Sequence, residues 1–268
     1  MQTTFGFPEL LRLIEDRSAA LRAAAASAPD FEAPLPTCPG WTLRELVRHV
    51  GGAQRRQAGI VTAGPDAGKP EQTWQDVAEA APTEREALIA WAAEGTRLLV
   101  DALREAGPDR GCWAFWQTAQ TPLTTRAVAR HQVYEAGIHA YDAQLAAGDA
   151  QPLPDEIAVD AVDEFLYTVG STSLPWPYKP AAMDVRATEG AFWRTTLDTA
   201  GVQLSRFAEA PAVPAEFILE GTAGDLALVL NGRLPVEHLK LEGDRTAWDL
   251  LAEWDPNDPA TPTAPSKG

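Results

Sequence analysis

Apolar residues in the first 150 positions recur every three or four residues, which is the period of an amphipathic helix. In the first such segment Leu10, Leu13 and Ile14 fall on one helical face. Four segments of this kind are predicted as long helices: Phe5 to Ala26, a segment that begins at Thr42, Pro82 to Ala106, and Pro122 to Ala147. Their apolar faces need a shared core, so the pattern predicts an antiparallel four-helix bundle.

The start of the second helix carries its own signal. Prolines interrupt the chain before it, and the run Thr42-Leu-Arg-Glu45 then reads as a capping box. In such a box the hydroxyl and the carboxylate each satisfy a backbone amide that the first helical turn leaves unpaired. Leu43, Leu46, Val47 and Val50 form the apolar face of the helix that follows.

The pattern changes after residue 150. Gln151 to Pro154 reads as a linker and Asp155 to Val169 as a helix, after which the apolar period falls from 3.6 to 2. The predicted strands are Met183 to Thr188, Phe192 to Leu197, Val202 to Ser205, Glu216 to Glu220 and His238 to Leu241, and the predicted helices among and after them are Leu226 to Leu230 and Thr246 to Trp254. We therefore expect a helical domain over residues 1–152, a small α+β domain over 153–256 and a disordered tail over 257–268.

Charge excludes some partners. The 22 Lys and Arg residues against 38 Asp and Glu residues give a formal net charge of −16 and a pI near 4.6, which repels nucleic acid and anionic membrane surfaces. No stretch reaches the roughly 18 apolar residues that a membrane span needs, and the first residues do not form a signal peptide. We expect a cytoplasmic protein, with its oligomeric state open and a monomer slightly favoured.

The histidines carry the candidate chemistry. His49 falls on the apolar face of the second helix, and Glu135 and His139 stand one turn apart on one face of the fourth. A carboxylate and an imidazole at this spacing can ligate one metal ion, with a third ligand from a facing helix. The same spacing also suits a plain hydrogen bond. Asp142 could be solvated, and His131 could be a partner of a ligand, a replacement ligand or a surface residue.

Three motifs resemble those of one family. These are the runs Cys38-Pro-Gly-Trp-Thr-Leu-Arg-Glu-Leu-Val-Arg-His49, Tyr134-Glu135-Ala-Gly-Ile-His139-Ala-Tyr-Asp142 and Gly221 to Arg233, the last followed by Gly243-Asp244. They resemble, in the same order, signatures of the mycothiol-dependent maleylpyruvate isomerase family. The resemblance implies a DinB-like four-helix bundle followed by a sterol-carrier-like α+β domain, which is an α+β fold class overall.

The resemblance also implies a site. A divalent metal, usually zinc, would be held by His49, Glu135 and His139. Arg233 matches an arginine that the family's C-terminal domain brings toward the active site, where it would serve in catalysis and bind a carboxylate of substrate or cofactor. A surface arginine beside a helix end is the alternative for Arg233. The reactive thiol would belong to mycothiol, so neither Cys38 nor Cys112 is needed as a nucleophile.

These expectations make the chain a metal-dependent enzyme that adds the thiolate of mycothiol to a small electrophile. Release of the adduct would make it an S-transferase, toward which the family's varied reactions lean, and rotation within the adduct followed by thiol loss would make it a cis–trans isomerase. Two alternatives stay open: a thiol-independent natural-product tailoring enzyme on the same fold, and a non-catalytic protein that binds a small ligand. The aromatic segments Trp113–Trp116 and Trp176–Tyr178 match no family pattern, and they could line a pocket or fill a core.

Overall fold

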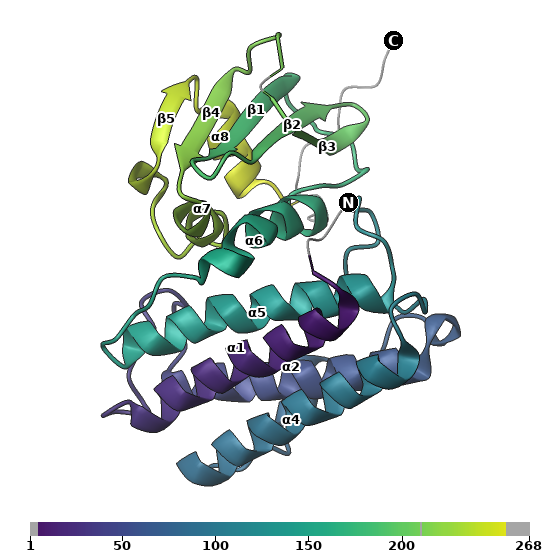
Figure 1. Ribbon diagram of the computed structural model, residues 1–268, viewed down its shortest axis with the longest axis vertical. Helices are drawn as coiled ribbons and strands as arrows, with labels where there is room; N and C mark the ends of the chain where they lie inside the picture. Colours follow the sequence, from purple (N-terminus) through teal and green to yellow (C-terminus); the bar gives the residue numbers. More distant parts are fainter. Residues whose placement is uncertain (1–4, 210, 256–268) are drawn as a thin grey trace. The chain divides into compact units, whose positions relative to one another are not determined.

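The computed structural model describes residues 5–209 and 211–255, drawn in colour in Figure 1. They form two compact units. The bundle unit holds residues 5–115 and 122–153, and the C-terminal unit holds residues 116–121 and the described residues from Pro154 onward. The expected disordered tail, 257–268, lies outside the described residues.

The bundle unit contains the four long helices that the apolar period predicts. They are α1 (Phe7–Ser27), α2 (Leu43–Ala63), α4 (Arg85–Ala106) and α5 (Thr125–Ala146). Their buried faces enclose a core in which leucine predominates, with Leu10, Leu13, Leu43, Leu46, Leu88 and Leu99 among its fully buried side chains. The connection between α2 and α4 contains a short 3-10 turn, Pro65–Ala67, and a five-residue helix, α3 (Trp74–Ala78), which the sequence reading did not identify.

The start of α2 confirms the predicted capping box. The backbone N–H of Thr42 donates to Glu45 Oε2 at 2.6 Å, and the backbone N–H of Glu45 donates to Thr42 Oγ1 at 3.4 Å. Farther along, α2 packs against α4 without room for a side chain at Gly51, where a Cβ atom would lie 2.4 Å from the indole of Trp91. The cap fixes the residue at which α2 begins, and the close approach at Gly51 fixes which face of α2 meets α4.

The C-terminal unit is the expected α+β arrangement, which confirms the predicted fold class. After α6 (Asp155–Thr168) come β1 (Ala181–Ala187), β2 (Phe192–Asp198), β3 (Gly201–Phe207), β4 (Phe217–Gly221), α7 (Ala223–Leu230), β5 (Lys240–Gly243) and α8 (Thr246–Glu253). The sheet has the order β3-β2-β1-β4-β5, in which β1 and β4 run parallel and the other neighbours antiparallel. Within this unit α6 packs against α7.

One segment of the C-terminal unit comes from within the bundle sequence. Residues 116–121 precede α5, yet the side chain of Gln120 pairs with the backbone of Leu204 on the edge strand β3. The Gln120 amide donates to Leu204 O at 3.1 Å, and the Leu204 N–H donates to Gln120 Oε1. A side-chain amide thus satisfies backbone groups that an edge strand leaves unpaired.

The last strand, β5, begins later than the predicted start at His238. It begins at Lys240, because the chain first turns through a short 3-10 helix, Val236–His238.

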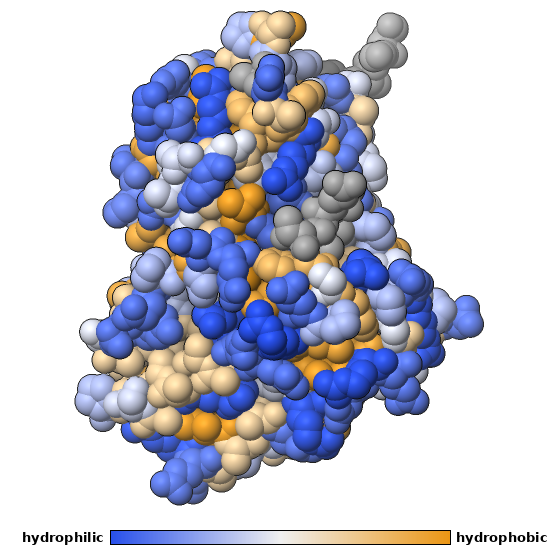
Figure 2. Space-filling model, in the orientation of Figure 1, coloured by the Kyte–Doolittle hydropathy of each residue, from blue (hydrophilic) through white to orange (hydrophobic). Residues whose placement is uncertain are grey.

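The face of the molecule shown in Figure 2 is mainly polar. Hydrophilic side chains cover most of the face shown in Figure 2, and the apolar patches between them are scattered. Among the described residues, every helix is too short or too polar to cross a lipid bilayer.

Candidate metal centre

Three predicted ligands meet between α2 and α5. The carboxylate of Glu135 lies between two imidazoles: its Oε1 is 3.0 Å from His49 Nε2 and 3.5 Å from His139 Nε2. Glu135 and His139 stand on one face of α5 because they are four residues apart, and His49 faces them from α2. The structure therefore brings together the residues that the helical period turned inward.

Burial and hydrogen bonding oppose each other in this cluster. Burial alone would raise the pKa of Glu135, but hydrogen bonds with His139 and His49 hold it well below its usual value. Burial alone would lower the pKa of His139, but its contacts with Asp142, Cys38 and Glu135 raise it well above its usual value. These contacts favour a carboxylate beside an imidazolium in the metal-free cluster, and a cation can take the place of the imidazolium proton.

A contact at Nδ1, the nitrogen that faces away from Glu135, orients the ring of His139. Its Nδ1 lies 2.9 Å from Oδ2 of Asp142, whose side chain is 0% exposed. The hydroxyl of Thr37 donates to Asp142 Oδ1 at 2.6 Å, and the thiol of Cys38 lies 3.5 Å from Oδ2. Asp142 is therefore buried and engaged, not solvated, and it fixes the ring so that Nε2 faces Glu135. Metal-binding histidines usually have such a carboxylate partner.

His49 is held by aromatic packing. Its ring centroid lies 4.8 Å from that of Trp41 and 4.5 Å, edge to face, from that of Trp74. Its buried Nδ1 has no hydrogen-bond partner among the described residues. The two indoles therefore fix the orientation of the His49 ring, as Asp142 fixes that of His139.

This geometry fits a divalent cation. The donor atoms of His49, Glu135 and His139 all lie within 4.8 Å of one another. Ligands at zinc distances of about 2.1 Å on a tetrahedron stand about 3.4 Å apart, close to the two separations at Glu135. The side chains of His49, Glu135 and His139 are 13%, 27% and 9% exposed, which leaves an approach for a further ligand.

A second group of donors, Cys38, His139 and Asp142, is equally compact. Asp142 is sealed from solvent there and already accepts hydrogen bonds from Thr37 and His139. The carboxylate oxygens of Asp142 are therefore engaged by other side chains of the protein. We therefore assign the second group the task of orienting His139.

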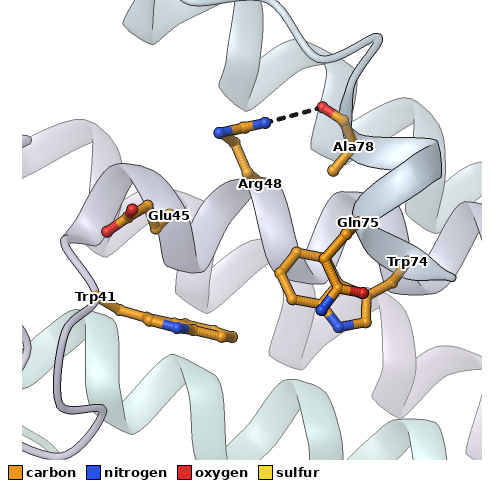
Figure 3. Close-up of a pocket in the computed structure, with 6 residues that line it drawn as sticks. All are labelled: Trp41, Glu45, Arg48, Trp74, Gln75 and Ala78. Carbon is orange, nitrogen blue, oxygen red and sulfur yellow. Dashed lines mark hydrogen bonds between the residues drawn. The ribbon is translucent and has the colours of Figure 1, made fainter.

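A small pocket opens beside His49, and we call it the aromatic pocket (Figure 3). Its volume is about 150 Å³, and it is lined by Trp41, Glu45, Arg48, Trp74, Gln75 and Ala78. Arg48 turns toward Ala78 and donates from Nη2 to its carbonyl oxygen at 3.2 Å. The sequence reading did not identify this pocket, although Thr73-Trp-Gln-Asp76, which forms a capping box at the start of α3, could have revealed the helix that carries Trp74.

The two remaining histidines and Cys112 lie outside this cluster. His131 is half-buried and packs edge-on against Phe115, with ring centroids 5.3 Å apart, and it belongs to neither donor group. His238 is exposed in the 3-10 turn before β5. Cys112 is buried, and burial raises the pKa of its thiol, which opposes a nucleophilic role.

Arg233 belongs to the C-terminal unit, just after α7. The helix ends in a Schellman motif: Gly232, at φ 71°, donates to Val229 O and the Arg233 N–H donates to Leu228 O. The guanidinium Nη1 donates to Asn231 O at 2.6 Å. The turn holds the start of this side chain firmly.

Two family models match the chain. The model of the mycothiol maleylpyruvate isomerase N-terminal domain matches residues 11–144, and the model of the MDMPI C-terminal domain, of the same family, matches residues 156–250. A comparison with curated proteins found no match.

Two crystal structures have a similar fold. They are a mycothiol-dependent maleylpyruvate isomerase, with 16% sequence identity and a TM-score of 0.57, and a histidine-to-alanine mutant of the mycothiol-dependent maleylpyruvate isomerase, with 14% identity and a TM-score of 0.59. Each match covers 90% of this chain and 96% of the other. At these identities the likeness establishes the fold.

Proposed function

We propose a function from the premise that this chain belongs to the mycothiol maleylpyruvate isomerase family. The proposal is a metal-dependent enzyme that uses mycothiol as its thiol and adds it to a small electrophile. The observation that carries it is the meeting of two imidazoles and one carboxylate in a partly open cluster. The two similar structures are of a mycothiol-dependent maleylpyruvate isomerase, which supports mycothiol as the thiol. It also makes cis–trans isomerisation the first reaction to test.

Each residue of the cluster has a separate task. His49 and His139 would hold the metal through Nε2, and Glu135 would add a carboxylate oxygen and compensate part of the charge. When bound, zinc or a similar divalent ion would supply a Lewis acid that lowers the pKa of a thiol near neutral pH. Asp142 would keep the Nδ1 proton of His139 in place, so that the ligating nitrogen stays available.

The thiol chemistry follows from electron flow in the substrate. When bound, mycothiol would supply a thiolate that can add to a conjugated double bond of the substrate. Loss of that thiolate after rotation about the former double bond would complete isomerisation, and protonation of the adduct would complete S-transfer instead. His49, Glu135 and His139 would hold the metal beside the thiol, and Arg233 would pair with a carboxylate of the substrate or cofactor.

Arg233 is proposed to pair with a carboxylate of the substrate or cofactor. A guanidinium is always charged and can donate two parallel hydrogen bonds to a carboxylate. The Schellman turn limits the freedom of its backbone, which lowers the entropic cost of such a contact. We expect Arg233→Lys to raise the KM for a carboxylate substrate while metal content stays unchanged.

The first test is metal content beside thiol dependence. We expect about one equivalent of metal in the wild type, none in His139→Ala and the wild-type amount in His131→Ala, which alters a histidine of the same helix outside the cluster. Turnover of a maleyl-type electrophile should require mycothiol. Metal retained by His139→Ala would refute the ligand set, and turnover without any thiol would favour a thiol-independent enzyme on this fold.

A further inference from the structure

We propose that the aromatic pocket binds the sugar part of the thiol cofactor, a proposal that rests on the function proposed above. Mycothiol is an N-acetylcysteine joined through an amide to a glucosamine–inositol unit. One end of the molecule is therefore a thiol on a short arm, and the other is a pair of polyhydroxylated rings. A site that uses it needs a place for each end.

The pocket lies where the second end would fall. Two of its walls, Trp41 and Trp74, contact the ring of His49, one of the proposed metal ligands. The two indoles also contact each other, with ring centroids 5.7 Å apart. The pocket therefore adjoins a proposed metal ligand, and the cysteine arm would span the layer formed by His49 and the two indoles between a thiol at the cluster and a ring in the pocket.

The chemistry of the lining suits a polyhydroxylated ring. Indole faces accept the C–H faces of sugars, and the polar members of the lining supply both kinds of hydrogen-bonding group. Glu45 accepts, Arg48 donates and Gln75 does both, which matches hydroxyl groups that donate and accept. Among the described residues Arg48 makes one side-chain hydrogen bond and no ion pair, so most of its five donors are available.

The same lining is poorly suited to the other substrate. A planar electrophile that carries carboxylates would bring negative charge next to Glu45, in a protein whose net charge is already −16. Glu45 cannot easily turn away, because its carboxylate closes the capping box of α2. A neutral polyol has no such penalty, and a volume of about 150 Å³ accommodates one ring more readily than two.

The kinetic test compares two thiols and two arginines of α2. Mycothiol carries the sugar, and N-acetylcysteine carries only the arm. We expect Arg48→Gln to raise the KM for mycothiol about tenfold and leave that for N-acetylcysteine within twofold. The matched control is Arg55→Gln, since Arg55 also donates one hydrogen bond to a backbone carbonyl, that of Trp91, and lies outside the pocket. Equal effects of Arg48→Gln on both thiols, or on neither, would refute the proposal.

A binding test separates this proposal from the proposed function. Glucosaminylinositol has the rings and no thiol, so its binding can be followed by saturation-transfer NMR whether or not the protein turns over any substrate. We expect signals from its ring protons with the wild type and with Arg55→Gln, and their loss with Trp74→Ala. The metal content of Trp74→Ala must be measured beside it. Binding that survives in Trp74→Ala, or no binding to the wild type, would overturn the proposal even if thiol-dependent turnover is established.

Discussion

Two carboxylates, Asp184 in the C-terminal unit and Glu135 in the bundle unit, differ in the partners that surround them and in their burial. Asp184 on β1 is 1% exposed and faces Arg194 directly across the sheet, with two hydrogen bonds of 2.7 and 3.0 Å. Glu135 faces two histidines and keeps 27% of its side chain exposed. An arginine neutralises its partner permanently, whereas an imidazole can give up its proton and bind a metal instead. The first pair supports the sheet, and the second cluster is available for chemistry.

Removing the charge of Glu135 should have the largest effect on activity. In Glu135→Gln the neutral amide is a weak metal ligand and no longer stabilises the cation between His49 and His139. We expect the variant to lose its bound metal. Its kcat/KM should fall by more than about 100-fold, which is the upper range for losing a residue that only hydrogen-bonds to a metal ligand. Metal analysis, steady-state kinetics and a thermal melt would check this. A variant that keeps both its metal and its activity would contradict the assignment.

The corresponding change at Asp184 should affect stability instead. Asp184→Asn leaves the guanidinium of Arg194 largely buried without its charged partner, which costs about 3 kcal/mol of the free energy of unfolding or more. We expect this loss in urea denaturation, with metal content per folded protein unchanged. A loss of metal comparable to that of Glu135→Gln would break the contrast between the two carboxylates.

A smaller effect is expected from the residue behind His139. Asp142→Asn keeps the size of the side chain but weakens its hold on the Nδ1 proton of His139. We expect a 10- to 100-fold weaker zinc affinity, measured by chelator competition. The exposed Asp101, which pairs with Arg97 and Arg104, provides the control, since Asp101→Asn should leave the affinity unchanged. Equal affinities in both variants would show that Asp142 does not orient the ligand.

The smallest effect concerns pH. His139 has a raised pKa in the metal-free protein, so its contribution to stability is complete below its usual value of 6.5 and is lost as the pH rises through the raised value. Glu135 has a lowered pKa, so its contribution is present above 4.5 and is lost in stronger acid. Zinc needs the neutral imidazole, and it should therefore raise Tm more at pH 8 than at pH 6. The Asp184→Asn penalty should not change over this range.

The positions of the three cluster residues could be predicted because the helical period alone tells which residues share a face of a helix. Glu135 and His139 share a face of α5 whatever packs against it, and His49 follows the apolar face of α2. Asp142 was harder, since three residues after His139 it could point to solvent or to the ring. Its burial depends on long-range packing, which includes contacts with Thr37 and Cys38, 105 and 104 residues away in the chain.

Other features lacked a sequence period altogether. Trp74 lies in a five-residue helix, too short to show an apolar repeat, and its position beside His49 depends on the fold of the whole α2–α4 connection. The same holds for Gln120, which lies in the irregular segment before α5. A single glutamine that pairs with the backbone of a strand 84 residues later leaves no pattern in the sequence.

The contact of Gln120 with β3 has a consequence for dividing this protein. The chain passes between the units at residues 115–116, 121–122 and 153–154, so a cut near residue 153 does not produce two complete halves. A fragment that starts at residue 154 would lack Gln120 and leave the N–H and C=O of Leu204 open on an edge strand, where another strand can add. Such a fragment should self-associate in a way that the full chain does not, and supplying residues 116–121 as a peptide should reduce that association.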